Sequence, residues 1–161
     1  MILMINVAVL WLVNENGEIL LAQRSYTKEN EPGVWGPSMT GRLDPGETFD
    51  QALVREAQEE LGLSAGDIEP RFLVKHTYDH PDGEQRVFGA YYAVFPGAKT
   101  DMLKLQESEV EGVAWYSLAK IEAWMRDRPQ ELVPSANDVW PATFEALIGA
   151  GVLGRSLEPT V

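Results

Sequence analysis

The sequence predicts a mixed α/β (α+β) sandwich, in which helices cover a β-sheet. Runs of β-branched and aromatic residues, which are typical of strands, lie on both sides of one helical segment, 48–61. Two further helical segments gather towards the end of the chain, and this order of elements favours a sheet with helices packed on it. The 161 residues are 45% hydrophobic and 24% charged, which suits a single globular domain, 1–161.

The first part of the chain predicts a hairpin, a loop and a short strand. Residues 4–13 are rich in Val, Ile and Leu, and an Asn-Gly turn separates them from the apolar run 18–24, so a β-hairpin is expected. Residues 25–37 are polar, contain two Pro and two Gly, and are predicted to form a loop. Residues 38–43 are predicted to form a short strand, which ends at the Asp-Pro-Gly sequence that follows.

The segment 48–61 is the strongest helical stretch of the sequence. Thr48 and, three residues later, Gln51 form a capping box at its start, and Gly62 supplies its end. An apolar ladder with a spacing of four residues runs from Phe49 to Leu61 and predicts the side of the helix that faces a core.

The second part of the chain predicts three strands and two helices. Residues 71–78 and 86–95 are rich in β-branched and aromatic residues and flank a turn sequence, so they form a second expected hairpin. Residues 112–116 are a short predicted strand, and 118–126 and 139–148 are predicted helices on either side of a Pro-containing loop.

Composition and charge exclude several classes of function. The absence of Cys excludes disulfides, thiolate metal sites and cysteine nucleophiles. The net charge of −12 repels nucleic acid polymers and anionic membranes, so neither is expected as a partner. The apolar start of the chain lacks a basic segment and a small-residue cleavage site, which favours a buried strand and a cytoplasmic protein over a signal peptide.

Three carboxylates share one face of the predicted helix. At 100° per residue, Glu56, Glu59 and Glu60 fall within an arc of roughly 100°. Like charges so placed repel each other, and a hard divalent cation such as Mg²⁺ prefers oxygen ligands of this kind. On the helix alone, a solvated acidic face stays an alternative to a metal site.

The spacing of residues 41–63 resembles the Nudix box at every specified position. Five residues separate the first glycine from a glutamate, seven more lead to an Arg-Glu pair, and an apolar residue, a Glu-Glu pair, a glycine and an apolar residue complete the pattern: Gly41, Glu47, Arg55, Glu56, Ala57, Glu59, Glu60, Gly62 and Leu63. The resemblance extends over residues 4–130, through a Gln-Arg sequence at 23–24, Trp35 and a Glu-rich segment before Trp115.

This resemblance implies a fold and an activity. The fold is an α/β/α sandwich around a mixed sheet, and the activity is hydrolysis of a diphosphate that is joined to an organic group, with Mg²⁺ or Mn²⁺ as cofactor. A small-molecule diphosphate is therefore the expected partner. A homodimer is left open.

The resemblance also implies roles for residues of the box. Glu56, Glu59 and Glu60 correspond to metal ligands, with Glu56 alternatively orienting or deprotonating the water. The backbone carbonyl of Thr40 is a further expected metal ligand, although glycine is more usual there. Glu47 and Arg55 are expected to pair and to brace the loop on the helix.

Three residues outside these positions complete the expected site. Glu109 is favoured over Glu107 and Glu111 as a catalytic carboxylate because it lies six residues before Trp115, the spacing seen in the family. Arg24 and Arg42 are candidates for contacts with the substrate phosphates. A structural role at a strand end stays the alternative for each arginine.

The segment 33–43, GVWGPSMTGRL, resembles a Nudix subgroup that includes relatives of isopentenyl-diphosphate isomerase. Isomerases of that subgroup need a catalytic Cys and metal-binding His residues, whereas this chain has no Cys and has Arg42 in place of the histidine. A hydrolase is therefore expected on this branch. A Nudix-fold module that binds a nucleotide without cleaving it is the alternative.

Overall fold

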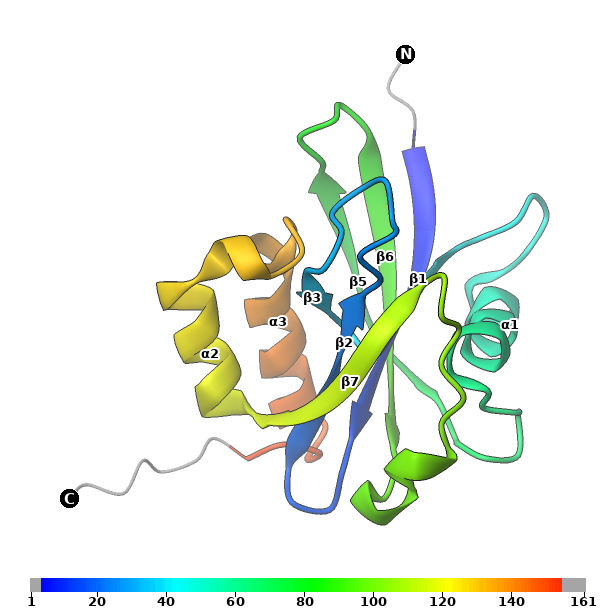
Figure 1. Cartoon of the computed structure of the whole chain (residues 1–161), viewed down its shortest axis with the longest axis vertical. Helices are drawn as coiled ribbons and strands as arrows, with labels where there is room; N and C mark the ends of the chain where they lie inside the picture. Colours follow the sequence, from blue (N-terminus) through cyan, green and yellow to red (C-terminus); the bar gives the residue numbers. More distant parts are fainter. Residues whose placement is uncertain (1–3, 155–161) are drawn as a thin grey trace.

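The computed structural model describes residues 4–154 and has three layers (Figure 1). A mixed sheet lies between α1 (Phe49–Leu61) on one side and α2 (Leu118–Asp127) and α3 (Ala136–Gly149) on the other. The predicted α/β/α sandwich is therefore confirmed.

Seven strands form the sheet in the order β3-β2-β1-β6-β5, with β4 paired to β1 and β7 paired to β2. In chain order they are β1 (Met4–Val13), β2 (Glu18–Arg24), β3 (Trp35–Gly36), β4 (Met39–Arg42), β5 (Arg71–Asp79), β6 (Gln85–Val94) and β7 (Val110–Ser117).

The predicted hairpin of residues 4–24 is present, since β1 and β2 pair antiparallel across the turn at 14–17, but the two strands separate after their first residue pair. β1 runs parallel to β6 along its whole length, but β2 pairs with it at Val13 and Ile19 alone. Residues 7–10 of β1 pair instead with β4. Ser38 fills the point of divergence, since its hydroxyl accepts from the backbone N–H of Leu12 at 2.9 Å and donates to the carbonyl of Leu20 at 2.6 Å. A turn signal cannot reveal a bridge made 18 and 26 residues away.

Two apolar layers cover the two faces of the sheet. The odd-numbered residues 7–13 of β1 pack towards α2 and α3, and the even-numbered residues 8–12 pack towards α1. Because β1 is buried on both faces, its sequence is a continuous apolar run instead of an alternating one.

Most other boundaries lie within three residues of the predicted ones. The predicted loop 25–37 contains the short strand β3, where Trp35 packs edge-on against Tyr116 and also contacts Trp124. Two 3-10 helices, Gly97–Met102 and Pro129–Glu131, were not predicted. Such short elements depend on tertiary contacts and leave no periodic pattern.

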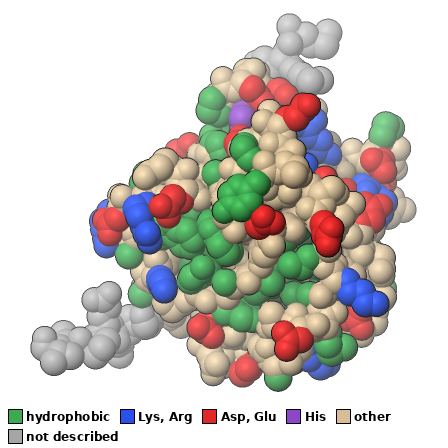
Figure 2. All heavy atoms as spheres, in the orientation of Figure 1, with side chains coloured by type: hydrophobic (Ala, Val, Ile, Leu, Met, Phe, Trp, Pro, Cys, Tyr) green, Lys and Arg blue, Asp and Glu red, His purple; other side chains and the backbone are tan. Residues whose placement is uncertain are grey.

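The surface reflects the acidic composition. Figure 2 shows acidic side chains distributed around the visible face, with hydrophobic side chains gathered near its centre. Among residues 4–154, no helix has both the length and the apolar character needed to cross a membrane.

Candidate active site beside α1

Local capping and core packing fix the orientation of α1. The predicted capping box is present, because Thr48 and Gln51 exchange side-chain to backbone hydrogen bonds of 3.0 and 3.2 Å. Gly62 ends the helix in the left-handed conformation, with φ of 69°. Leu53 and Leu61 are buried beneath the helix, so the glutamates of the opposite face are turned towards β4 and the loops beside it.

Gly41 allows β4 to approach α1 closely. A Cβ atom at this position would lie 2.2 Å from Cγ and 2.3 Å from Cδ of Glu56. Any side chain at residue 41 would therefore displace the Glu56 carboxylate. Close packing against Glu56 thus explains why the first residue of the box is a glycine in this chain.

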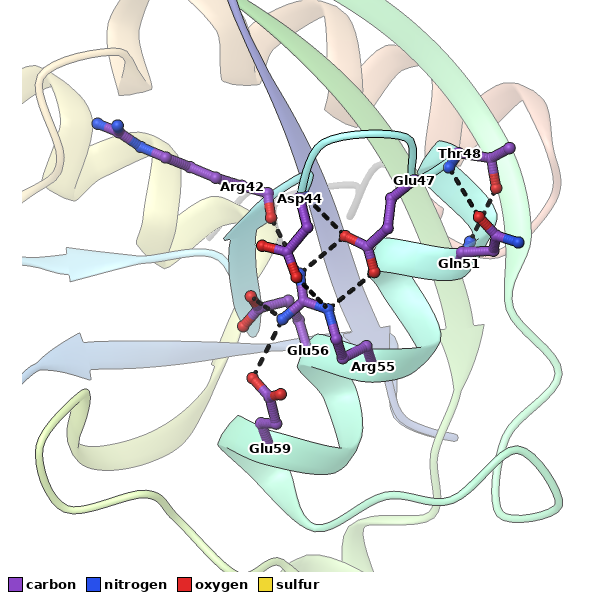
Figure 3. Close-up of polar contacts among 8 residues, drawn as sticks. All are labelled: Arg42, Asp44, Glu47, Thr48, Gln51, Arg55, Glu56 and Glu59. Atoms are coloured by element: carbon purple, nitrogen blue, oxygen red, sulfur yellow. Dashed lines mark hydrogen bonds and ion pairs between the residues drawn. The ribbon is translucent and has the colours of Figure 1, made fainter.

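Arg55 holds the acidic residues around it in fixed positions (Figure 3). It makes two hydrogen bonds to the Glu47 carboxylate, of 2.8 and 2.9 Å, and contacts Glu56 at 2.8 Å and Glu59 at 3.2 Å. Nη2, which also donates to Glu47, donates to the carbonyl of Arg42 at 3.1 Å. The expected Glu47–Arg55 pair is present, and it ties the loop before α1 to both β4 and the helix.

The carboxylates have displaced pKa values for identifiable reasons. Hydrogen bonds from Arg55 and from the backbone N–H of Asp44 lower the pKa of Glu47 to about 2. Burial raises the pKa of Glu56, against the effect of Arg55. Burial, together with the charges of Glu56 and Glu109, raises the pKa of Glu60 to about 8. Crowded carboxylates of this kind favour a bound cation.

A single cleft of about 970 Å³ collects most of the predicted site residues. Seven of them line it: Arg24, Thr40, Arg42, Glu56, Glu59, Glu60 and Glu109. Glu47 and Arg55 lie outside the lining and hold the helix and loop behind it. The arrangement therefore separates residues that can meet a ligand from residues that position them.

Glu109 reaches the cleft from the turn before β7. Glu107 and Glu111 are exposed and do not belong to the cleft lining. The Glu109 carboxylate forms an ion pair of 2.6 Å with Lys28, a residue that sequence reasoning missed. Lys28 lies in the segment 25–37, which has no motif, so only the fold reveals that it faces a glutamate 81 residues away.

The two arginines occupy different parts of the cleft. Arg24 donates to the carbonyls of Asn30 and Glu31, at 2.9 and 3.1 Å, and so shapes the loop beside the cleft. The Arg42 side chain is 60% exposed, lies 3.9 Å from Glu84, and points away from the carboxylates around Arg55 (Figure 3). Contacts of either arginine with phosphate stay predictions.

The donor set suits a hard divalent cation in its chemistry. Glu56, Glu59 and Glu60 offer carboxylate oxygens, and Glu60 has no hydrogen-bond or ion-pair partner for its side chain within residues 4–154. In the described part of the chain, no three acidic or imidazole side chains are already arranged to hold a metal ion. Arg55 contacts both Glu56 and Glu59.

Comparison with known proteins places this site in a family. The sequence model of the NUDIX domain matches residues 3–136, most of the chain. The chain belongs to the Nudix family. The cleft that holds the glutamates of α1 is therefore the Nudix-box cleft of this chain.

Relatives with curated names come from the isomerase branch. A Paenarthrobacter aurescens protein named isopentenyl-diphosphate Delta-isomerase is 36% identical over 141 residues, which are 84% of this chain and 73% of that protein. Salmonella proteins of the same name are 33% identical, and the chain spans 58% of their length. The predicted relation of this Nudix chain to the isomerase branch is confirmed.

Solved structures share the fold. DR0079 from Deinococcus radiodurans superposes with a TM-score of 0.74 at 19% identity, over 87% of this chain and 83% of that one. A MutT NUDIX hydrolase from Burkholderia pseudomallei has a TM-score of 0.62 at 26% identity, over 90% of this chain and 96% of that one. The Nudix fold of the chain is thus seen in proteins of low sequence identity.

Proposed function

We propose that this Nudix chain hydrolyses a diphosphate linkage in a nucleoside di- or triphosphate or a related organic diphosphate. One observation carries the proposal: three glutamates of one helix and Glu109 of a distant turn line the same cleft. Carboxylates repel each other, so a helix face that is merely solvated does not require a fourth carboxylate from another element beside it. Basic residues in the same lining supply complementary charge for phosphate oxygens.

Each group has a defined part in this reaction. A bound Mg²⁺ or Mn²⁺ ion, held by Glu56, Glu59, Glu60 and the Thr40 carbonyl, would polarise the phosphates and offset their charge. Glu109 or Glu56 accepts the proton of the attacking water as its oxygen bonds to phosphorus and the bond to the leaving oxygen breaks. Arg24 and Arg42 bind phosphate oxygens.

The experiment is a phosphate-release assay with nucleoside di- and triphosphates, dinucleoside polyphosphates, sugar nucleotides and isoprenoid diphosphates, with and without Mg²⁺ or Mn²⁺. We expect metal-dependent turnover that falls by about 10²- to 10⁴-fold in Glu109→Gln, the range for a lost general base. Glu111→Gln is the matched control, because that residue is exposed two positions away and does not line the cleft.

A third variant, Glu60→Gln, and a nucleotide-binding measurement can contradict the proposal. Full metal-dependent turnover in Glu60→Gln would contradict the assigned site. Tight nucleotide binding without turnover would instead favour the non-catalytic module.

The names of the relatives favour isomerisation as a second candidate activity. The chain contains no Cys, and Arg42 stands where the subgroup has a histidine, so the residues expected for that chemistry are missing. Isopentenyl diphosphate separates the two activities: hydrolysis releases phosphate, whereas isomerisation yields dimethylallyl diphosphate and releases none. We expect no dimethylallyl product.

A further inference from the structure

The cleft has a second part that the proposed reaction does not use. It extends to the face of the sheet that α3 covers, where Val7, Val9, Phe88 and Ala90 form its floor. Strand register makes this floor continuous, since Val7 lies opposite Phe88 and Val9 opposite Ala90 on the neighbouring strand. We name this part the α3 arm. Its floor is apolar.

One charged residue adjoins the floor of the α3 arm: Arg86 lies two positions before Phe88 on the same face of β6 and is paired with Asp82 at 3.1 Å. The charged groups that line the cleft come from α1, from segments 24–31 and 106–109, and from the neighbourhood of the β5–β6 turn and the end of β4. Among the described residues, α3 contributes Val139, Trp140 and Thr143 to the lining and no charged residue. Because Arg86 is already paired with Asp82, a charged group in this arm would lose its hydration without gaining an ionic partner that is free of a counter-charge. An uncharged group loses less hydration free energy in this arm and needs no ionic partner.

One polar pair lies at the inner end of the α3 arm. His76 on β5 lies opposite Phe88 in the strand register, and its Nε2 is 3.3 Å from the hydroxyl oxygen of Thr143 on α3. Thr143 donates its proton to the carbonyl of Val139, also at 3.3 Å. The Thr143 hydroxyl is then an acceptor for His76, so Nε2 carries the ring proton.

This tautomer leaves Nδ1 of His76 as a hydrogen-bond acceptor. Burial lowers the pKa of His76, which keeps the ring neutral near pH 7. Within residues 4–154, the buried side-chain atoms without a hydrogen-bond partner are Oε2 of Glu84 and Nε of Arg86. Nδ1 of His76 is not one of them and has no hydrogen-bond partner among the described residues, so this lone pair is accessible, on a side chain that lines the cleft.

We propose that the α3 arm binds the organic group of the substrate, that this group is uncharged and planar with an N–H donor, and that His76 selects it. A nucleobase with an exocyclic amino group has this chemistry. A sugar lacks the apolar faces that match the floor, and a hydrocarbon lacks the donor that matches Nδ1. The inference rests on the proposed function for the place of the diphosphate, but it is testable without turnover.

The test measures the affinity of monophosphates that differ in one donor. Calorimetry with Mg²⁺ compares adenosine monophosphate with purine riboside monophosphate, and cytidine monophosphate with its 4-deamino analogue. We expect the amino compound of at least one pair to bind about 10-fold more tightly, the effect of one hydrogen bond. The variant His76→Phe keeps a ring of similar shape, and the preference is expected to disappear in it. His76→Gln retains an acceptor and is expected to restore part of it.

The outcomes separate this inference from the proposed hydrolase. A preference that is absent from the wild type in both pairs, or that survives in a folded His76→Phe protein, overturns the inference even if the protein hydrolyses diphosphates. A preference that depends on His76 in a protein without turnover supports the inference and contradicts the hydrolase. Where turnover exists, His76→Phe is expected to raise KM for the amino substrate by a larger factor than KM for the matched substrate without the amino group.

Discussion

At the scale of single residues, the site depends on one arginine. Arg55 contacts Asp44, Glu47, Glu56 and Glu59 within 3.4 Å, and it is 27% exposed. The planar guanidinium meets Glu47 with two parallel hydrogen bonds, which a lysine cannot reproduce. The Nudix resemblance predicted the pair with Glu47, whereas the other contacts depend on rotamers that only the fold fixes.

The Glu47–Arg55 pair makes stability depend on pH. The pKa of Glu47 is lowered to about 2 in the folded chain from an ordinary value of 4.5. A depressed folded pKa contributes stability above pH 4.5, and this contribution is lost as the pH falls towards 2. We expect Glu47→Gln to be less stable than the wild type at pH 6 and the difference to shrink between pH 4.5 and 2. Urea unfolding at several pH values measures it. A difference that does not vary with pH would contradict the assignment.

Gly41 is expected to act on activity more than on stability. In Gly41→Ala the new methyl group would overlap the Glu56 side chain and displace it from its present position. We expect a loss of turnover of at least about 10-fold, because misplaced catalytic groups reduce rates strongly. Gly112→Ala is the matched control, since nothing lies within 4 Å of a Cβ there. Equal turnover in Gly41→Ala and Gly112→Ala would contradict the claim that a methyl group at residue 41 displaces a catalytic Glu56.

At the scale of elements, the sequence predicts what local interactions determine. α1 was predicted to within one residue because its capping box and its left-handed Gly62 are local signals. The hairpin of β1 and β2 was predicted, but its shortness was not, because β4 and Ser38 approach from elsewhere in the chain. β3 was missed since two residues carry no periodicity. Elements whose partners are distant in sequence were the ones least predictable.

Ser38 is expected to hold the division of the sheet. Its fully buried hydroxyl serves one backbone N–H of β1 and one carbonyl of β2. Ser38→Ala leaves both groups without a partner, and we expect unfolding free energy to fall by about 1–3 kcal/mol. Ser64→Ala, at an exposed position after α1, is the control and is expected to change stability by less than about 0.5 kcal/mol. Denaturant unfolding measures both variants. Similar losses of unfolding free energy in Ser38→Ala and Ser64→Ala would contradict this role of Ser38.

At the scale of the whole molecule, the site joins one continuous motif with several separate segments. The glutamates of the box were predictable because they lie within residues 41–63 and on one helix face. Lys28 and His76 were not, because the sheet and the loops bring them to the cleft from positions without a motif. The sequence therefore predicts where the proposed chemistry occurs, whereas substrate choice depends on the three-dimensional lining.

Because the net charge is −12, cations can stabilise this chain without binding at a specific site. Mg²⁺ can stabilise the chain by binding the cleft or by screening general repulsion. At ten times its dissociation constant, a site ligand adds about 1.4 kcal/mol, or roughly 3–5 °C in Tm. We expect this rise in the wild type, its reversal by EDTA, and its absence in Glu60→Gln and in KCl of equal ionic strength. Glu69→Gln removes an exposed charge outside the cleft and is expected to keep the rise. An equal rise in all three proteins would indicate screening alone and would restore the solvated acidic face as the explanation of the helix.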